Sequence, residues 1–266
     1  MRRIMITIAY DGTDYVGWQM QPNGIAVEQV INKALSELLN EDIIIAGASR
    51  TDSGVHADGN VAVFDTETRI PAEKICFALN QRLPKDIVCT DSCEVDPDFH
   101  PRRADCIKTY EYRIYNAVHP DPLKRRYSYF VYVPLDIEAM RTAAEYLKGE
   151  HDFASFCSAH AQVRTTVRNV YSLDIIASNN SPENDTVNAK KYMASDIVIR
   201  ISGNGFLYNM VRIIVGTLVK VGYHFYPPEY VKNILEACDR TKAGPKAPAE
   251  GLKLVGIEYT PFPYVK

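Results

Sequence analysis

The order of apolar patterns in the first 95 residues constrains the fold more than any other feature of the chain. Apolar residues recur three and four positions apart over 26–39, which predicts an amphipathic helix. Pro71 suits the first turn of a second helix. Strand patterns are found at 2–10, 43–47, 59–67 and 86–95. The resulting β-α-β-β-α-β order is typical of ferredoxin-like units.

The second half of the chain repeats this theme loosely. Strands are expected at 109–116, 127–133, 170–176, 195–202 and 252–259, and helices at 136–148, at 207–221 and after Pro227-Pro228. The stretch 178–191 has no periodicity and predicts a loop. We therefore expect an α+β protein with an N-terminal domain over 1–105 and a C-terminal domain over 106–266. Both would be ferredoxin-like (RRM-like) units, with mostly antiparallel sheets that flank a central basic cleft.

Composition narrows the class of protein. The 266 residues carry a net charge of −3, so binding to nucleic acid would need a concentrated basic patch. The six cysteines form no CxxC pair and no HExxH motif is present, which argues against structural zinc and fits reduced thiols. The N-terminus turns polar too soon for a signal peptide, and no apolar run approaches a membrane span. A cytoplasmic protein without membrane contact is expected.

The segment ASRTDSGVHADG, residues 48–59, combines charge and glycine in a way that suits a functional turn. Arg50 would hold Asp52 ionised, and an ionised aspartate can act as a nucleophile or a base. Gly47 and Gly54 permit a tight turn at a strand end. The alternative is a capped surface turn in which Arg50 is only an ion-pair partner. His56 is expected to be structural.

Three further stretches contain candidate functional residues. FHPRR and IKTYEYR interleave cations with aromatics around Tyr110 and Tyr112, which suits RNA, although both tyrosines could be ordinary strand core. GNGFLYNMVRIIVG places Arg212 on an apolar helix, where it either snorkels to solvent or pairs with a buried carboxylate. AGPKAPAEGL leads into the last strand as a loop or a plain linker.

Together these stretches resemble the TruA family of tRNA pseudouridine synthases over the whole chain. The matching segments, in order, are YDGTDYVGWQMQP, SRTDSGVHADGNVAVF, FHPRR, KTYEYRIYN, HDFASF, GNGFLYNMVRIIVG and APAEGL. The resemblance assigns the nucleophile to Asp52, its neighbouring arginine to Arg50, the base-stacking tyrosine to Tyr110, the carboxylate-pairing arginine to Arg212 and a pocket leucine to Leu252. The chain departs from the family at Ser49, Ser53, Asn60 and Arg103, which we expect at the rim of the site.

The resemblance implies isomerisation of uridine to pseudouridine at positions 38 to 40 of the tRNA anticodon stem-loop. It implies a homodimer that grips the tRNA across both subunits and needs no cofactor and no metal. Whether Asp52 attacks the ribose or the uracil stays open. The target uridine would flip out of its stack, and Tyr110 would stack on it. The basic cleft would be lined by Arg50, Arg102, Arg103, Lys108, Arg164 and Arg168.

Two other functions are compatible with these residues. The first is an RNA-binding protein on the same scaffold that lacks catalysis or has a different target. The second is a carboxylate hydrolase such as a nucleoside glycosidase, which needs a second catalytic carboxylate. Asp58 or Asp11 would have to serve as that carboxylate.

Overall fold

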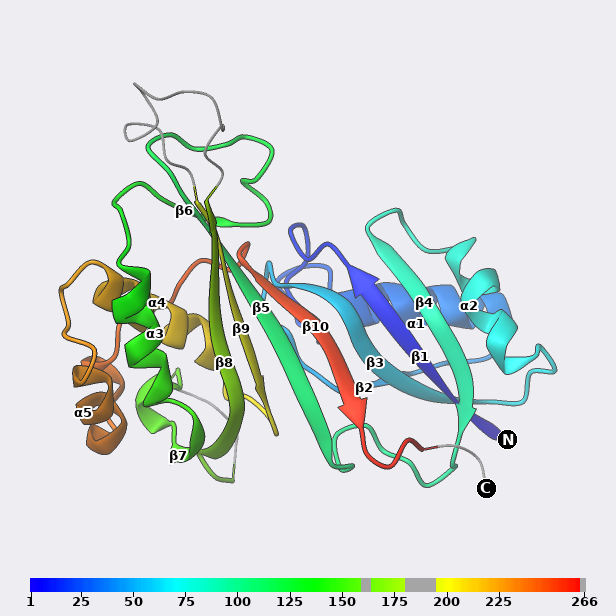
Figure 1. Ribbon diagram of the computed structural model, residues 1–266. Helices are drawn as coiled ribbons and strands as arrows, with labels where there is room; N and C mark the ends of the chain where they lie inside the picture. The colour runs from blue at the N-terminus through cyan, green and yellow to red at the C-terminus, as the bar shows by residue number, and fades with distance from the viewer. Residues whose placement is uncertain (159–163, 180–194, 264–266) are drawn as a thin grey trace. The chain divides into compact units, whose positions relative to one another are not determined.

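The computed structural model describes residues 1–158, 164–179 and 195–263. The chain forms two compact units (Figure 1), of which unit 1 comprises Met1–Lys108 with Lys253–Lys266 and unit 2 comprises Thr109–Leu252. The chain therefore passes between the units twice, after Lys108 and after Leu252. Within the described ranges no helix is long and apolar enough to cross a membrane.

Unit 1 is built on a mostly antiparallel sheet. Its elements are β1 (Arg2–Tyr10), α1 (Val27–Leu39), β2 (Ala46–Gly47), β3 (His56–Thr66), α2 (Ala72–Asn80), β4 (Ile87–Val95) and β10 (Leu252–Tyr259). The order β4-β1-β3 continues on one branch to β2, and each of these neighbouring pairs is antiparallel. On the other branch β10 runs parallel to the beginning of β3, with Lys253 opposite His56.

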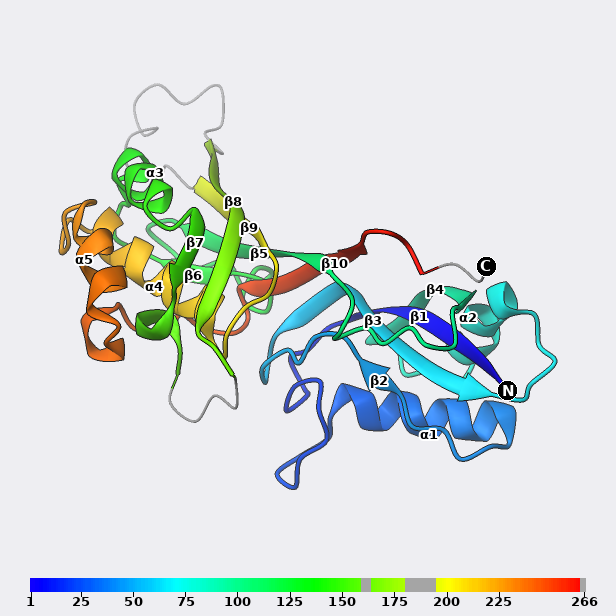
Figure 2. The ribbon, with the colours of Figure 1, turned by 90° about the horizontal axis from the view of Figure 1, so that it is seen from below.

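Both faces of the unit 1 sheet are buried. Met5 pairs with Val63, and on that face they join an apolar cluster with Phe99 and Tyr259. The opposite face carries fully buried isoleucines of β1, for example Ile6. Figure 2 shows α1 running along one face of this sheet. Because the cluster residues cover the Met5 face, the isoleucine face is the one left for the helices.

The strand predicted over 43–47 is wrong in length, since β2 covers only Ala46–Gly47. The backbone N–H groups of Ile43 and Ile45 donate to side chains of α1, Ser36 Oγ and Asn32 Oδ1, each at 3.0 Å. An N–H that is satisfied by a side chain is not available to a β ladder. The apolar run therefore packs as an irregular segment against the helix.

Unit 2 is also a mixed α and β structure. Its elements are β5 (Cys106–Asn116), β6 (Tyr129–Val131), α3 (Ile137–Glu145), β7 (Gly149–Asp152), η1 (Ala154–Phe156), β8 (Val167–Asn179), β9 (Ser195–Gly203), α4 (Met210–Gly222), α5 (Tyr230–Ala237) and η3 (Arg240–Lys242). The sheet order is β5-β9-β8-β7, and β6 pairs in parallel with β5. The described residues of the two units thus form an α+β protein with five α-helices and mostly antiparallel strands.

Helix α4 forms the centre of unit 2, because almost every one of its residues is buried. The segment 243–252 packs directly on it. A Cβ at Gly216 would lie 1.7 Å from the carbonyl oxygen of Pro245, and one at Gly244 would lie 2.7 Å from the backbone of Thr217. Thr217 also accepts a hydrogen bond from the Gly244 N–H at 2.9 Å. Two glycines and one threonine thereby attach the predicted loop to the helix.

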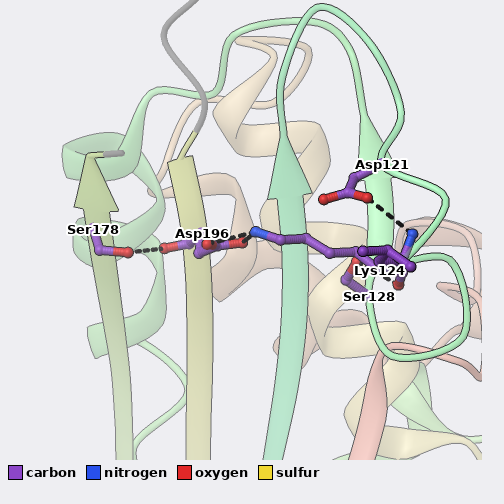
Figure 3. Close-up of polar contacts among 6 residues, drawn as sticks. Asp121, Lys124, Ser128, Ser178 and Asp196 are labelled. Carbon is purple, nitrogen blue, oxygen red and sulfur yellow. Dashed lines mark hydrogen bonds and ion pairs between the residues drawn. The ribbon is translucent and has the colours of Figure 1, made fainter. Parts of the chain in front are cut away.

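The side chain of Lys124 attaches the connection from β5 to β6 to the sheet (Figure 3). Lys124 Nζ lies 2.5 and 2.7 Å from the two carboxylate oxygens of Asp196 on β9, and 4.3 Å from the ring centroid of Tyr115. Ser178 on β8 donates to the Asp196 carbonyl at 3.2 Å. Ser178 and Asn179 were predicted to begin a loop and instead extend β8, while 180–191 of that loop lie outside the described residues.

Candidate active site

Asp52 lies in a tight turn between β2 and β3, within a segment that we call the Asp52 loop (residues 48–55). The loop begins at Ala48, whose N–H donates to the Val61 carbonyl at 2.7 Å. It ends in a turn in which the Val55 N–H donates to the Asp52 carbonyl at 3.1 Å. Asp52 is half-buried, whereas Arg50 is exposed. Both candidate side chains are therefore set on a loop that leads directly into a long strand.

The segment that follows β1 packs against the Asp52 loop and holds its backbone. The Trp18 N–H donates to the Thr51 carbonyl at 3.1 Å, and the Tyr15 carbonyl accepts from the Gly54 N–H at 3.3 Å. Gly17 has a φ of +110°, and a Cβ there would lie 2.7 Å from the Thr51 carbonyl oxygen. Only glycine permits both this backbone conformation and this close approach.

A chain of buried polar groups lies against the same loop. The Tyr10 hydroxyl is 2.7 Å from Thr51 Oγ1. Asn60 Nδ2 donates to the Ser49 carbonyl at 3.0 Å and to the Tyr10 hydroxyl at 3.4 Å. Asn60 is fully buried and Ser49 is also buried. The expectation that these two departures from the family lie at the rim is therefore wrong, because Ser49 is a buried residue of the loop itself and Asn60 is buried against it.

His56 and the two alternative carboxylates make contacts within unit 1. His56 is buried, and its Nδ1 accepts from the Gly12 N–H at 3.1 Å, with Asp11 Oδ1 also 3.1 Å away. Asp11 Oδ1 further accepts from the Thr13 N–H at 3.0 Å. Asp58 is exposed, and its Oδ2 lies 2.5 Å from Lys253 Nζ. These contacts are those of turn and surface residues, which weakens the case for a second catalytic carboxylate at either position.

Basic side chains gather in unit 1 at the FHPRR segment and at the start of β5. Arg102 and Arg103 are exposed, and burial together with these two charges lowers the pKa of His100. His100 Nδ1 accepts from the Arg102 N–H at 3.2 Å, which also favours the neutral ring. Lys108 Nζ donates to the Ala48 carbonyl at 2.9 Å, so this lysine fastens the beginning of the Asp52 loop.

Tyr110 and Tyr112 lie on the same side of β5 in unit 2. Tyr110 is buried, and its ring meets that of Phe206 edge-on at a centroid distance of 5.3 Å. Tyr112 is fully buried, its hydroxyl donates to the Pro248 carbonyl at 2.8 Å, and burial raises its pKa. Tyr112 is therefore a core residue that also holds the loop before β10.

Arg212 is buried on α4, with only 8% of its surface exposed, so snorkelling to solvent is excluded. Its Nε donates to the Ala247 carbonyl at 2.8 Å, and Nη1 donates to Asn209 Oδ1 at 3.1 Å. The Ala247 N–H donates back to the Arg212 carbonyl at 3.0 Å. Leu252 is buried at the end of the same loop. Arg212 thus orders the segment that ends at Leu252.

The sequence candidates fall in both units: Asp52, Arg50 and Arg102 in unit 1, and Tyr110, Arg212 and Leu252 in unit 2. Of the remaining basic candidates in unit 2, Arg164 is exposed and Arg168 is half-buried, with burial lowering the Arg168 pKa. Sequence reasoning did not identify Tyr10, Thr51 and Trp18 as supports of the Asp52 loop. The YDG turn and the single tryptophan were the available signals, but both lie well before that loop in sequence and meet it only in the folded chain.

Comparison with known proteins gives consistent matches over almost the whole chain. The family model described as tRNA pseudouridine synthase matches residues 6–102 and 143–260. The tRNA pseudouridine synthase A of Ruminiclostridium cellulolyticum is 47% identical over 97% of this chain and 100% of its own length. The enzyme of the same name from Brevibacillus brevis is 45% identical over 97% of this chain and 100% of its own length.

Proposed function

The chain belongs to the tRNA pseudouridine synthase family, and from this premise we propose that it isomerises uridine to pseudouridine in tRNA. The observation that carries the proposal is the full-length identity with curated enzymes of this name, in which the Asp52 loop falls inside the matched region. The protein is accordingly an isomerase. We assign its target to the anticodon stem-loop, at positions 38 to 40.

The reaction rearranges bonds without gain or loss of atoms. The bond between the ribose C1′ and uracil N1 breaks, the base turns, and a bond forms between C1′ and uracil C5. The proton on C5 is lost and N1 gains one, so no oxidant or reductant is needed. We assign the nucleophile to Asp52, because its loop is held rigidly while the residue itself keeps access to solvent.

The other candidate residues have roles that follow from their chemistry. Tyr110 would stack on the flipped base, a contact worth about 1–3 kcal/mol against an unstacking cost of a few kcal/mol. Arg50, exposed two positions before Asp52, would bind a phosphate or occupy the space that the base leaves. Arg212 would keep Asp52 ionised, and Leu252 would line the base pocket. These assignments follow the family resemblance, residue by residue.

We further propose how the tRNA is bound. The exposed Arg50, Arg102 and Arg103 would contribute to a central basic cleft, with Lys108, Arg164 and Arg168 completing it. The antiparallel order β4-β1-β3-β2 supports a ferredoxin-like unit in the N-terminal half, and we propose a second such unit in the C-terminal half. A cytoplasmic homodimer, with each tRNA held across both subunits, is the assembly we propose.

The direct test is pseudouridine formation in unmodified tRNA transcripts, mapped by position. Wild type should form product in the anticodon stem-loop, and Asp52→Ala should form none while it binds tRNA with nearly unchanged affinity. Asp42→Asn, which changes an exposed aspartate outside the Asp52 loop, is the matched control and should stay active. Tight binding without product in wild type would favour a non-catalytic RNA-binding protein, and release of free uracil would favour a glycosidase.

Salt dependence tests the basic cleft separately. With a net charge of −3 on the chain, tRNA affinity has to come from local contacts between cations and phosphates. The logarithm of the binding constant should fall linearly with the logarithm of salt concentration, by about 0.7–0.9 for each phosphate contact. Arg102→Ala with Arg103→Ala should flatten that slope by roughly one to two contacts. An unchanged slope would remove both arginines from the cleft.

A further inference from the structure

The polar groups of three buried side chains meet beside the Asp52 loop, two of them on strands of unit 1 and one on the loop itself. We propose that Tyr10, Thr51 and Asn60 are positioning residues, which set the backbone of the Asp52 loop for the chemical step. This inference rests on the proposed function, because it names residues that act through the proposed nucleophile. None of the three was a candidate for a role in the reaction on sequence grounds.

A β-bulge brings these side chains together. Ile8 pairs with Asn60, but Tyr10 pairs with Ala57, so β3 has one extra residue between the two pairs. A bulge of this kind re-aims side chains without ending the strand pairing. At this bulge the Tyr10 hydroxyl comes within hydrogen-bonding distance of both Asn60 Nδ2, at 3.4 Å, and Thr51 Oγ1, at 2.7 Å.

The hydrogen bonds link the three side chains in a row. Asn60 Nδ2 can only donate, so the Tyr10 oxygen accepts from it, while between the Tyr10 and Thr51 hydroxyls either one can be the donor. Asn60 Nδ2 uses its other proton on the Ser49 carbonyl at 3.0 Å. Aligned hydrogen bonds in a low-dielectric interior strengthen one another. These hydrogen bonds therefore fix the loop at two positions, Ser49 and Thr51, on the N-terminal side of Asp52.

The backbone on the other side of Asp52 is fixed by different groups. The Tyr15 carbonyl accepts from the Gly54 N–H and from the Ser53 hydroxyl, both at 3.3 Å. Asp52 is thus the residue between two anchored segments. A nucleophile needs its reacting atom within a few tenths of an ångström of the productive place, and a displacement near 1 Å can lower the rate about 100-fold. A polar cluster in an otherwise apolar sheet face is consistent with that requirement.

The test is a double-mutant cycle with Tyr10→Phe and Thr51→Val, each of which removes a hydroxyl and keeps the shape. Each single variant should lower kcat about 10-fold, while KM for tRNA stays within about twofold. The double variant should be no more than about twofold slower than the worse single variant, because one shared hydrogen bond is lost in all three. Tyr259→Phe is the matched control, since its buried hydroxyl donates to the Pro101 carbonyl at 2.9 Å in the same unit.

Three kinetic outcomes would overturn the proposal. Unchanged kcat in both single variants would show that the hydroxyl pair does not position the loop. Losses that multiply in the double variant would show that the two groups act independently. An equal loss of kcat in Tyr259→Phe would show that any buried hydroxyl of unit 1 has the same effect, so that the role is only structural.

A second readout keeps this inference separate from the proposed function. Amide hydrogen exchange in peptides that cover residues 48–55 should become faster in Tyr10→Phe and in Thr51→Val, but not in Tyr259→Phe. If wild type forms no pseudouridine, the proposed function fails, and the exchange result still decides whether these side chains hold the loop. Unchanged exchange in both variants would overturn the inference even if wild type is active.

Discussion

Replacing Gly17 with alanine should move the proposed nucleophile without touching it. Gly17 lies in the segment after β1, with φ at +110°, and its missing Cβ leaves room for the backbone of the Asp52 loop. An added Cβ would lie 2.7 Å from the Thr51 carbonyl oxygen and 3.1 Å from the Asp52 carbonyl carbon. Both contacts are with main chain, so no side-chain rotation can relieve them.

The size of the effect follows from the backbone strain at position 17 and from the displacement of the Asp52 loop. A non-glycine residue in this backbone region costs about 1–3 kcal/mol in the free energy of unfolding. The contact at 2.7 Å must also lengthen to about 3.4 Å, the ordinary separation, so Thr51 and its neighbour Asp52 shift by about 0.7 Å. By the scaling for misplaced reacting groups, such a shift lowers kcat on the order of 10- to 100-fold.

Two assays measure these terms separately. Single-turnover pseudouridine formation reports the chemical step. Urea unfolding followed by fluorescence of Trp18, which is buried beside the loop and is the chain's single tryptophan, reports stability. Gly256→Ala in β10 is the control, because its Cβ would meet nothing within 4 Å, and it should change stability by no more than about 0.5 kcal/mol. Wild-type kcat and stability in Gly17→Ala would refute the close approach.

Three further predictions concern stability and reactivity. Arg3 donates to both carboxylate oxygens of Asp65 at 2.7 Å and lowers the pKa of that carboxyl. The pair should therefore stabilise the protein above the unfolded pKa of about 3.9 and lose its effect as pH falls through the lower folded pKa. In urea unfolding at a series of acid pH values, the free energy of unfolding should fall more steeply with decreasing pH for wild type than for Asp65→Asn. Thr217→Val leaves the Gly244 N–H without its acceptor and should cost about 1–3 kcal/mol in denaturant unfolding, whereas a cost near zero would show that the loop does not depend on it. Cys238 is exposed, whereas burial raises the pKa of Cys89 to about 12, so limited maleimide should label Cys238 first, and rapid labelling of Cys238→Ser would contradict this.

Strong periodicity made several elements predictable. The strand at 2–10 and the helix at 26–39 agree with β1 and α1 to within one residue, because a β-rich run that ends in a turn decides the first and one apolar stripe decides the second. The strand at 43–47 could not be placed in the same way. Its backbone bonds go to Ser36 and Asn32, which are side chains of a helix, and no local pattern records them. β7 was missed because Gly149–Asp152 has no alternating apolar residues.

The candidate site was predictable as a set of residues and not as a set of contacts. The residues around Asp52 stand together in the sequence, so a local motif was sufficient to find them. The interactions of Asn60 and Arg212 depend on partners distant in sequence, 11 and 35 residues away. A strand position gives only the face of a side chain, and the bulge in β3 changes even that.

The return of β10 to unit 1 has a consequence for how the protein is made. Lys253 and Leu254 pair with His56 and Ala57, the first residues after the Asp52 loop. During synthesis the N-terminus leaves the ribosome first, so most of unit 1 emerges before unit 2. Its final strand becomes available only after all of unit 2 has been translated. A ribosome-bound chain that ends before Leu252 would expose an unpaired edge of β3. The unit that carries the proposed nucleophile would thus be the last to complete its sheet. Chains from interrupted translation would lack the final strand of that unit and would be inactive rather than partly active.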